Sequence, residues 1–197
     1  TNILEIGCSN VIFKLNKNIS ISITGAECEF FINDQLKPIW QIYSVKKGDI
    51  LRIGKIISGN WIYLAVKNGF DIKKELGSFS TTIKEKIGGL DGNRLKIGDV
   101  LPFNKSKRLN KTFLKKEFIP KYEDELTLRV VLSSQYKEFS NTELKKFFSN
   151  TYIVTKDFNR MAYKLDGNPI NCNIDGIISE GISFGSIQIP KDGKPII

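Results

Sequence analysis

A chain of 197 residues with 41% hydrophobic content is long enough to bury the core of one large domain or of two small ones. Its formal net charge of +9 does not favour nucleic-acid binding, because the lysines are scattered and only five residues are arginine, the side chain suited to bidentate phosphate contacts. With no histidine, three widely spaced cysteines (Cys8, Cys28 and Cys172) and no apolar run of about 18 residues, the sequence predicts no metal site, disulfide framework or membrane segment, and we expect a cytoplasmic protein.

Short alternations of apolar and polar residues dominate the first hundred positions. In residues 18–34, isoleucines alternate with polar side chains, which is typical of a strand with one buried face. Turn-forming pairs such as Asn33-Asp34 and Gly59-Asn60 separate the predicted strands. This regular punctuation predicts an antiparallel barrel or sandwich. Further strands are expected at residues 39–45, 50–56 and 61–66.

Glycine turns and hydroxyl side chains replace this alternation in residues 70–102. Thr82 and Glu85 have the spacing of a capping box, which predicts a short helix that ends at Gly88-Gly89. Irregular segments of this kind often carry binding residues on a rigid scaffold. We therefore expect this segment to contribute to a functional site.

A run of mixed charges around a proline, residues 106–125, predicts a linker between two β-rich units. The first unit is expected to cover residues 1–105. The second unit is expected to cover residues 126–197 and to be incomplete at its C-terminal end.

The predicted second unit begins with a strand at residues 126–135. A helix is expected to start at Ser140, where Glu143 completes a capping box. Two extended pieces are expected on either side of residues 157–163. One face of the predicted helix is apolar and consists of Leu144, Phe147 and Phe148.

Two interpretations fit the closing segment, residues 179–197. Glu180 stands between Ser179 and Gly181, and a carboxylate beside small residues can hold a substrate amide close to backbone N–H groups. Alternatively, the segment is a turn between strands, with the isoleucines on either side of Gln188 buried and Gln188 exposed. Composition favours the turn, and the segment lacks the Gly-Lys-Ser or Gly-Lys-Thr ending of a phosphate loop.

Five segments occur in order along the chain: TGAECEFFIND, WIYLAVKNGFDIKKELGSFSTT, IGGLDGNRLKIGDVLP, NRMAYKLDG and SEGISFGSIQIPKDGKPII. Together they resemble the family that contains the C subunit of bacterial 5-oxoprolinase, also described as allophanate hydrolase subunit 2 and as the carboxyltransferase domain of urea amidolyase. The resemblance implies a mainly β fold with a few short helices, in which two cyclophilin-like β-barrel units face each other across a cleft. It also implies a partner subunit of related architecture.

The same resemblance implies chemistry at an amide or urea carbonyl. In the 5-oxoprolinase branch, the subunit assists the ATP-dependent opening of 5-oxoproline to glutamate, with ATP bound by this chain or by its partner. In the urea amidolyase branch, the domain moves a carboxyl group from carboxybiotin to urea, and biotin is needed only there. A third alternative is a non-catalytic regulatory module that binds a partner protein. It is favoured by Phe79 and Trp61, which stand where the family often has arginine.

Three segments supply the site residues that the resemblance implies, and Glu180 is expected to act as the acid or base. Several of these side chains have structural alternatives, since Ser80 or Thr81 can cap a turn and Arg160 can close a surface ion pair. The expected catalytic residues are Ser179, Glu180 and Gln188. The expected substrate-binding residues are Asp71, Ser78, Ser80, Thr81, Asn159, Arg160, Tyr163 and Gly181, and no metal ligand is expected.

Overall fold

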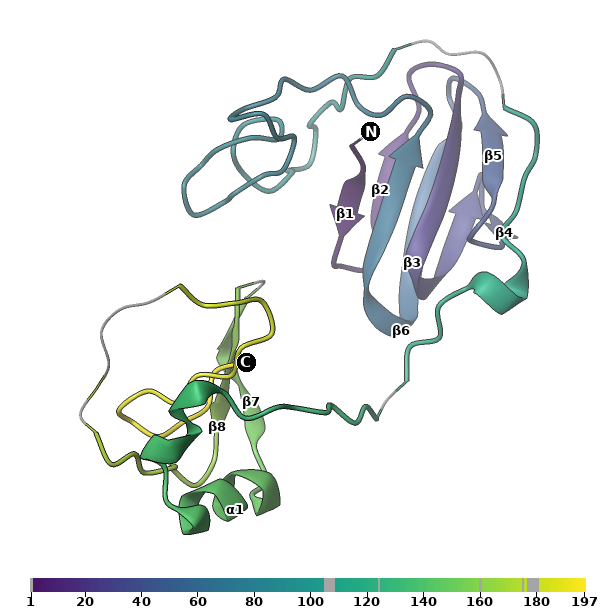
Figure 1. Ribbon diagram of the computed structural model, residues 1–197. Coiled ribbons are helices and arrows are strands. Elements are labelled where there is room, and N and C mark those ends of the chain that lie inside the picture. The colour runs from purple at the N-terminus through teal and green to yellow at the C-terminus, as the bar shows by residue number, and fades with distance from the viewer. Residues whose placement is uncertain (1, 105–108, 124, 160, 175, 177–180) are drawn as a thin grey trace. The chain divides into compact units, whose positions relative to one another are not determined.

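The protein separates into two compact units, Thr1–Leu126 and Thr127–Ile197, which are described one at a time (Figure 1). The computed structural model describes residues 2–104, 109–123, 125–159, 161–174, 176 and 181–197. Each unit is built around an antiparallel sheet, so the prediction of a mainly β protein with few short helices is confirmed. No helix in these ranges has the length and apolar composition needed to cross a lipid bilayer.

Two long antiparallel strands form the centre of the first unit, β3 (Ile19–Ile32) and β6 (Ile50–Val66) (Figure 1). Four shorter strands extend the sheet to six: β1 (Leu4–Ile6) and β2 (Val11–Lys14) pair with β6, and β4 (Gln35–Lys37) and β5 (Ile42–Val45) pair with β3. No pairing joins the two outer edges in the described part of the chain, so this sheet is open there. A closed barrel is therefore not confirmed. A short 3₁₀ helix, η1 (Lys116–Phe118), follows in the same unit.

The alternating isoleucines of β3 face the core, as the period-two pattern predicts. Ile21 and Ile23 of β3 pack with Ile53 and Ile62 of β6 around Phe30, whose side chain is 0% exposed. Burial of one such side chain contributes about 1.5–3 kcal/mol. This apolar layer fixes the sheet from which the loop of residues 70–103 extends.

A single strand, β6, replaces the two strands and the turn that the sequence predicts around Gly59-Asn60. The register of β3 against β6 shifts between Gly25 and Glu27, which identifies a bulge where Ala26 faces the stretch around Gly59. Gly59 has a φ of 81°, and a Cβ atom there would lie 3.1 Å from the Ala26 Cβ. The glycine thus allows the strand to bend without ending, and the prediction of a turn was wrong.

The helix predicted from Thr82 and Glu85 is also wrong. Thr82 and Ile87 instead exchange two backbone hydrogen bonds, of 2.8 and 3.2 Å, which close a tight turn. Lys86 has a φ of 56°, outside the helical region. The segment between Thr82 and Ile87 is too short to form the successive backbone hydrogen bonds of a helix. A turn in which these two residues bond to each other satisfies the N–H and C=O groups of both.

The second unit contains a two-stranded sheet, β7 (Ile153–Phe158) and β8 (Tyr163–Asp166), which confirms the two predicted extended pieces. No strand forms at residues 126–135. Residues 127–132 belong to no helix or strand and have no pairing partner in the described part of the chain, and a 3₁₀ helix, η2 (Ser134–Glu138), follows. A β-prone segment becomes a strand only where a neighbouring strand accepts its backbone hydrogen bonds, and the sequence does not encode that neighbour.

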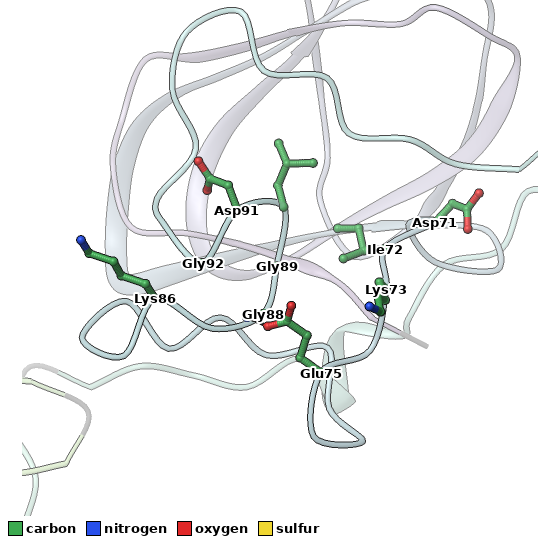
Figure 2. Close-up of a pocket in the computed structure, with 10 residues that line it drawn as sticks. Asp71, Ile72, Lys73, Glu75, Lys86, Gly88, Gly89, Asp91 and Gly92 are labelled. Carbon is green, nitrogen blue, oxygen red and sulfur yellow. Dashed lines mark hydrogen bonds between the residues drawn. The ribbon is translucent and has the colours of Figure 1, made fainter.

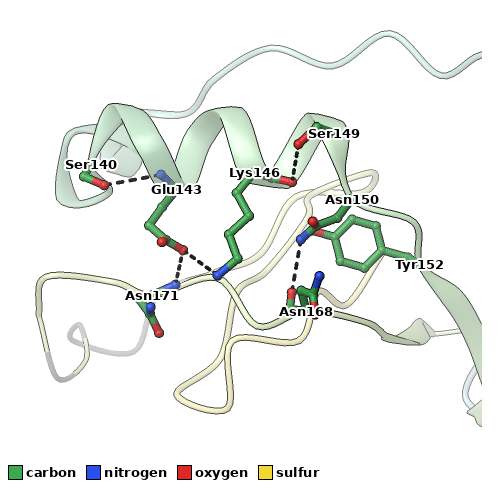
Figure 3. Close-up of polar contacts among 8 residues, drawn as sticks. All are labelled: Ser140, Glu143, Lys146, Ser149, Asn150, Tyr152, Asn168 and Asn171. Atoms are coloured by element: carbon green, nitrogen blue, oxygen red, sulfur yellow. Dashed lines mark hydrogen bonds and ion pairs between the residues drawn. The ribbon is translucent and has the colours of Figure 1, made fainter.

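Helix α1 (Asn141–Ser149) begins at Ser140, as the capping box predicts (Figure 3). The Ser140 hydroxyl accepts a hydrogen bond from the Glu143 N–H at 3.3 Å. The Glu143 carboxylate accepts a bond of 2.7 Å from the Asn171 N–H and one of 3.4 Å from the Lys146 ammonium, which lower its pKa. The helix is thereby fastened to the loop beyond β8. Of its predicted apolar face, Leu144 and Phe147 are half-buried, whereas Phe148 is 60% exposed.

Candidate functional site

The site residues predicted from the sequence divide between the two units. Ser179, Glu180 and Arg160 lie outside the described residues. The first unit holds Asp71, Ser78, Ser80 and Thr81, and the second holds Asn159, Tyr163, Gly181 and Gln188.

A pocket of about 380 Å³ opens in the irregular loop of the first unit (Figure 2). One wall consists of residues 71–73 and Glu75, which leave the end of the sheet. The opposite wall consists of Lys86 and the glycine-rich turn at residues 88–92. Ile72 and Leu90 give the pocket an apolar part, and five charged side chains surround it.

Three positions of the turn at residues 88–92 favour glycine because of their backbone conformation. Gly88, Gly89 and Gly92 have φ values of 76°, 64° and 71°, which favour glycine. A Cβ on Gly88 would lie 2.1 Å from the Ser80 carbonyl oxygen, so the turn also needs glycine for packing. The backbone of the turn therefore approaches its neighbours more closely than any other residue would allow.

Glu75 connects the two walls of the pocket (Figure 2). Its Oε2 atom accepts a hydrogen bond of 2.6 Å from the Gly88 N–H, and the Gly92 N–H donates to the Gly88 carbonyl at 2.8 Å. A charge-assisted bond of this kind fixes the orientation of the carboxylate. Glu75, Lys73 and Lys86 were missed by the sequence analysis. The signal was present in IGGLDG, whose first two glycines were interpreted as the end of a helix.

The hydroxyl cluster, Ser78, Ser80 and Thr81, does not line the pocket. The Ser78 hydroxyl accepts a hydrogen bond of 3.1 Å from the Ser80 N–H, which is a local turn contact. A Cβ on Gly89 would lie 2.1 Å from the Thr81 hydroxyl oxygen, so Thr81 contacts the glycine turn. Of the four residues predicted in this unit, Asp71 alone lines the pocket. The substrate-binding roles of the other three stay predictions.

The β7–β8 hairpin and the C-terminal segment bring three predicted residues of the second unit onto one small sheet. The Asn159 side-chain oxygen accepts bonds from the backbone N–H groups of Met161 and Ala162, at 2.7 and 3.3 Å, and so closes the hairpin turn. Tyr163 exchanges backbone bonds with Ile197, and the adjacent Ile196 exchanges backbone bonds with Gln188.

Side-chain surroundings differ among these residues. The Tyr163 ring stacks on Phe158 with ring centroids 5.7 Å apart. The Gln188 side chain is exposed between half-buried isoleucines, which agrees with the turn interpretation of the closing segment. Gly181 is exposed, and a Cβ on it would meet nothing within 4 Å. The proposed roles of all three stay predictions.

Crossed ion pairs, Lys194 with Asp166 at 2.6 Å and Lys164 with Asp192 at 3.2 Å, hold the C-terminal segment against β8. The Lys194 ammonium lowers the pKa of Asp166, which in turn raises the pKa of Lys194. The pKa of Asp192 is lowered first by the Lys194 backbone N–H and then by the Lys164 ammonium. These contacts position the ribbon that carries Gln188.

The described residues offer no metal-binding cluster, and the buried thiol of Cys28 is not a suitable nucleophile. No group of three Cys, Asp or Glu side chains in the described ranges is arranged to hold a metal ion. Cys28 is buried in the sheet, where desolvation and the neighbouring Glu27 raise its pKa to about 11. A thiol of that pKa is protonated at neutral pH and is a poor nucleophile.

Comparison with known proteins gives consistent matches along the chain. Residues 1–197 match the family model described as carboxyltransferase domain, subdomain A and B. The C subunit of the Escherichia coli 5-oxoprolinase is 30% identical over 197 residues, covering 98% of this chain and 62% of that protein. Urea amidolyase of Saccharomyces cerevisiae is 32% identical over 157 residues, which cover 75% of this chain and 8% of that protein.

Solved structures extend this likeness to the fold. The crystal structure of the Kluyveromyces lactis urea carboxylase superposes with a TM-score of 0.78 and 25% identity, covering 99% of this chain and 19% of that one. The present chain spans about 62% of the length of the bacterial 5-oxoprolinase component that it matches.

Proposed function

The chain belongs to the carboxyltransferase-domain family, and from this membership we propose that it is a subunit of an ATP-dependent amidohydrolase that opens 5-oxoproline to glutamate. The observation that carries the proposal is the match to the C subunit of 5-oxoprolinase over 98% of the chain. The same relatives support a partner subunit. We also propose that the two open sheets are parts of two cyclophilin-like barrels.

In the proposed reaction, one water is added across the C–N bond of the lactam. The carbonyl carbon takes the hydroxyl group, and the ring nitrogen takes the proton and leaves as an amine. Coupled hydrolysis of ATP to ADP and phosphate consumes a second water and supplies the free energy, with ATP bound by this chain or by its partner. Hydrogen-bond donors at the carbonyl oxygen are needed because that oxygen gains negative charge.

We assign these tasks to the residues predicted from the sequence. Glu180 transfers the proton, and Ser179 and Gln188 contact the carbonyl group. The Gln188 side chain suits this task because it is exposed and its amide has no partner among the described residues, while its backbone is fixed by Ile196. Tyr163 belongs to the same small sheet and is assigned to substrate binding.

The direct test is glutamate release from 5-oxoproline by the chain co-expressed with its partner subunits. We expect release that requires ATP and is lost in Glu180→Gln, while the matched variant Glu123→Gln retains it. Absence of release from a complete complex would contradict the proposed function.

Carboxyl transfer from carboxybiotin to urea is the second candidate. It is favoured by the family description and by the match to urea amidolyase. Urea turnover that depends on a biotinylated carrier would identify it. Stable binding of a partner protein without turnover of either substrate would instead identify a regulatory module.

A further inference from the structure

We propose that the glycine-lined pocket of the first unit, between residues 71–75 and 86–92, binds a small molecule that carries both a carboxylate and an amide N–H. No residue of this pocket except Asp71 belongs to the site predicted from the sequence. The choice of 5-oxoproline as its ligand rests on the proposed function, because that molecule combines one carboxylate with one lactam N–H on a small ring.

Lys73 supplies the anion-binding part. It stands on one wall of the pocket, whereas the Lys86 side chain on the other wall points away from the pocket (Figure 2). Lys73 has no ion-pair partner among the described residues, so a carboxylate in the pocket would pair with it at little cost.

The Glu75 carboxylate supplies the part that would bind the amide N–H. One oxygen of Glu75 is held by the Gly88 N–H at 2.6 Å, whereas no described residue bonds the other oxygen. That second oxygen therefore presents a fixed acceptor for a ligand N–H group, with the orientation of the carboxylate already determined. Ile72 and Leu90 offer the apolar contact that a ring of methylene groups requires.

Charge balance disfavours a polyanionic ligand. Three carboxylates, those of Asp71, Glu75 and Asp91, surround the pocket beside the two lysine residues of its walls. Because Lys96 also pairs with Asp91 at 3.9 Å, these charges sum to about zero and offer no net attraction for a phosphate or a nucleotide, whereas a singly charged ligand that also donates an N–H finds a complement for each group. The volume of about 380 Å³ is that of a small-molecule site.

Calorimetric titration of the 197-residue chain with three probes tests both halves of the pocket. The probes are 5-oxoproline, 2-pyrrolidone, which lacks the carboxylate, and cyclopentanecarboxylate, which lacks the lactam. We expect 5-oxoproline to bind with a dissociation constant near or below about 1 mM, and each of the other two probes to bind at least about tenfold more weakly, because each lacks one charge-assisted bond.

Two variants separate the contacts further. Lys73→Gln is expected to weaken 5-oxoproline and cyclopentanecarboxylate about tenfold and to leave 2-pyrrolidone unchanged. Glu75→Gln keeps an oxygen for the Gly88 N–H, and is expected to weaken 5-oxoproline and 2-pyrrolidone but not cyclopentanecarboxylate. The matched controls are Lys74→Gln and Glu85→Gln, which remove the same charges from residues that do not line the pocket.

The proposal is overturned if 5-oxoproline gives no binding heat at about ten times that concentration, or if Lys74→Gln and Lys73→Gln have equal effects. An unchanged cooperative unfolding transition in each variant excludes misfolding as the cause. The turnover assay distinguishes a failure of the proposed pocket from a failure of the proposed function. Binding that follows the predicted pattern in a complex without turnover supports the pocket and removes the proposed function, whereas turnover without binding at the pocket does the reverse.

Discussion

The two units are stabilised by different forces. The first unit buries one face of a six-stranded sheet, whose core includes Phe30, Ile53 and Ile62. In the described part of the second unit, the buried apolar side chains are Leu165, Ile170 and Pro195. Its elements are held instead by a capped helix, backbone pairing and the crossed ion pairs. The pocket is therefore carried by a rigid apolar scaffold, whereas the ribbon with Gln188 depends on polar contacts that solution conditions can weaken.

Loss of an aromatic core residue from the first unit should destabilise the protein most. Phe30→Ala removes a side chain that is 0% exposed and whose ring lies tilted against that of Tyr43, so we expect a loss of about 3–5 kcal/mol in the free energy of unfolding. Phe148→Ala in the second unit is the control, since that ring is mostly exposed, and it should cost far less. Urea denaturation measures both, and similar losses would refute the contrast between the units.

A smaller loss is expected from a methyl group on the glycine turn. Gly88→Ala places a side chain at positive φ and drives it into the Ser80 carbonyl oxygen. Gly77→Ala is the matched control, because Gly77 has nearly the same φ, 77°, with open space around it. Positive φ costs both variants about 1–2 kcal/mol. The clash should cost Gly88→Ala a further ~1–3 kcal/mol in thermal or urea unfolding. Equal losses would show that packing does not restrict the turn.

The N-terminal cap of α1 should contribute about 1 kcal/mol to the free energy of unfolding. Ser140→Ala removes the hydroxyl that accepts from the Glu143 N–H, and leaves that N–H without its helical cap. Hydrogen exchange of the α1 amides should accelerate accordingly, while Thr142→Ala, in the same first turn, should not accelerate it. Unchanged exchange in Ser140→Ala would mean that the contacts of Glu143 hold the helix alone.

The crossed ion pairs should contribute least to the stability of the fold, because they are exposed and therefore screened by salt. The pKa values of Asp166 and Asp192 are lowered in the folded protein, so their contribution is present above about pH 4 and is lost as pH falls through the folded values. The raised pKa of Lys194 gives a contribution that is present below about pH 10 and is lost as pH rises through its folded value.

Hydrogen exchange of the Leu165 amide, which donates to the Pro195 carbonyl, reports on these ion pairs. We expect faster exchange at high salt, below about pH 4 and in Asp192→Asn, after correction for the intrinsic exchange rate. Asp157→Asn is the control from β7. Exchange that ignores salt would show that backbone pairing alone holds the ribbon.

The predictable parts of the fold are those that depend on residues close together in the sequence. The strand alternation depends on burial of every second residue, and Asn33 and Asp34 adopt the positive φ values that a tight hairpin turn requires. The cap at Ser140 needs only the residues next to it. Each of these features is encoded within a few positions, so the sequence predicts it correctly.

Features that depend on distant partners were not predictable. The bulge near Gly59 requires Ala26 of another strand, and the turn after Thr82 depends on how its ends pair. The pocket combines Glu75 with a glycine turn more than ten residues later, through a hydrogen bond that no spacing rule anticipates. Asp71 was predicted because it precedes the hydroxyl cluster in a segment of the family pattern, whereas Lys73 and Glu75 carry no pattern of their own.

Binding of 5-oxoproline by the glycine-lined pocket can be located by mapping amide chemical shifts in the isotopically labelled chain during titration with that molecule. We predict shifts at Lys73, Glu75 and the Gly88–Gly92 turn, with or without shifts at Tyr163 and Gln188, and no response from the amides of α1. Shifts confined to the second unit, or an unresponsive spectrum at saturating ligand, would contradict the proposed pocket.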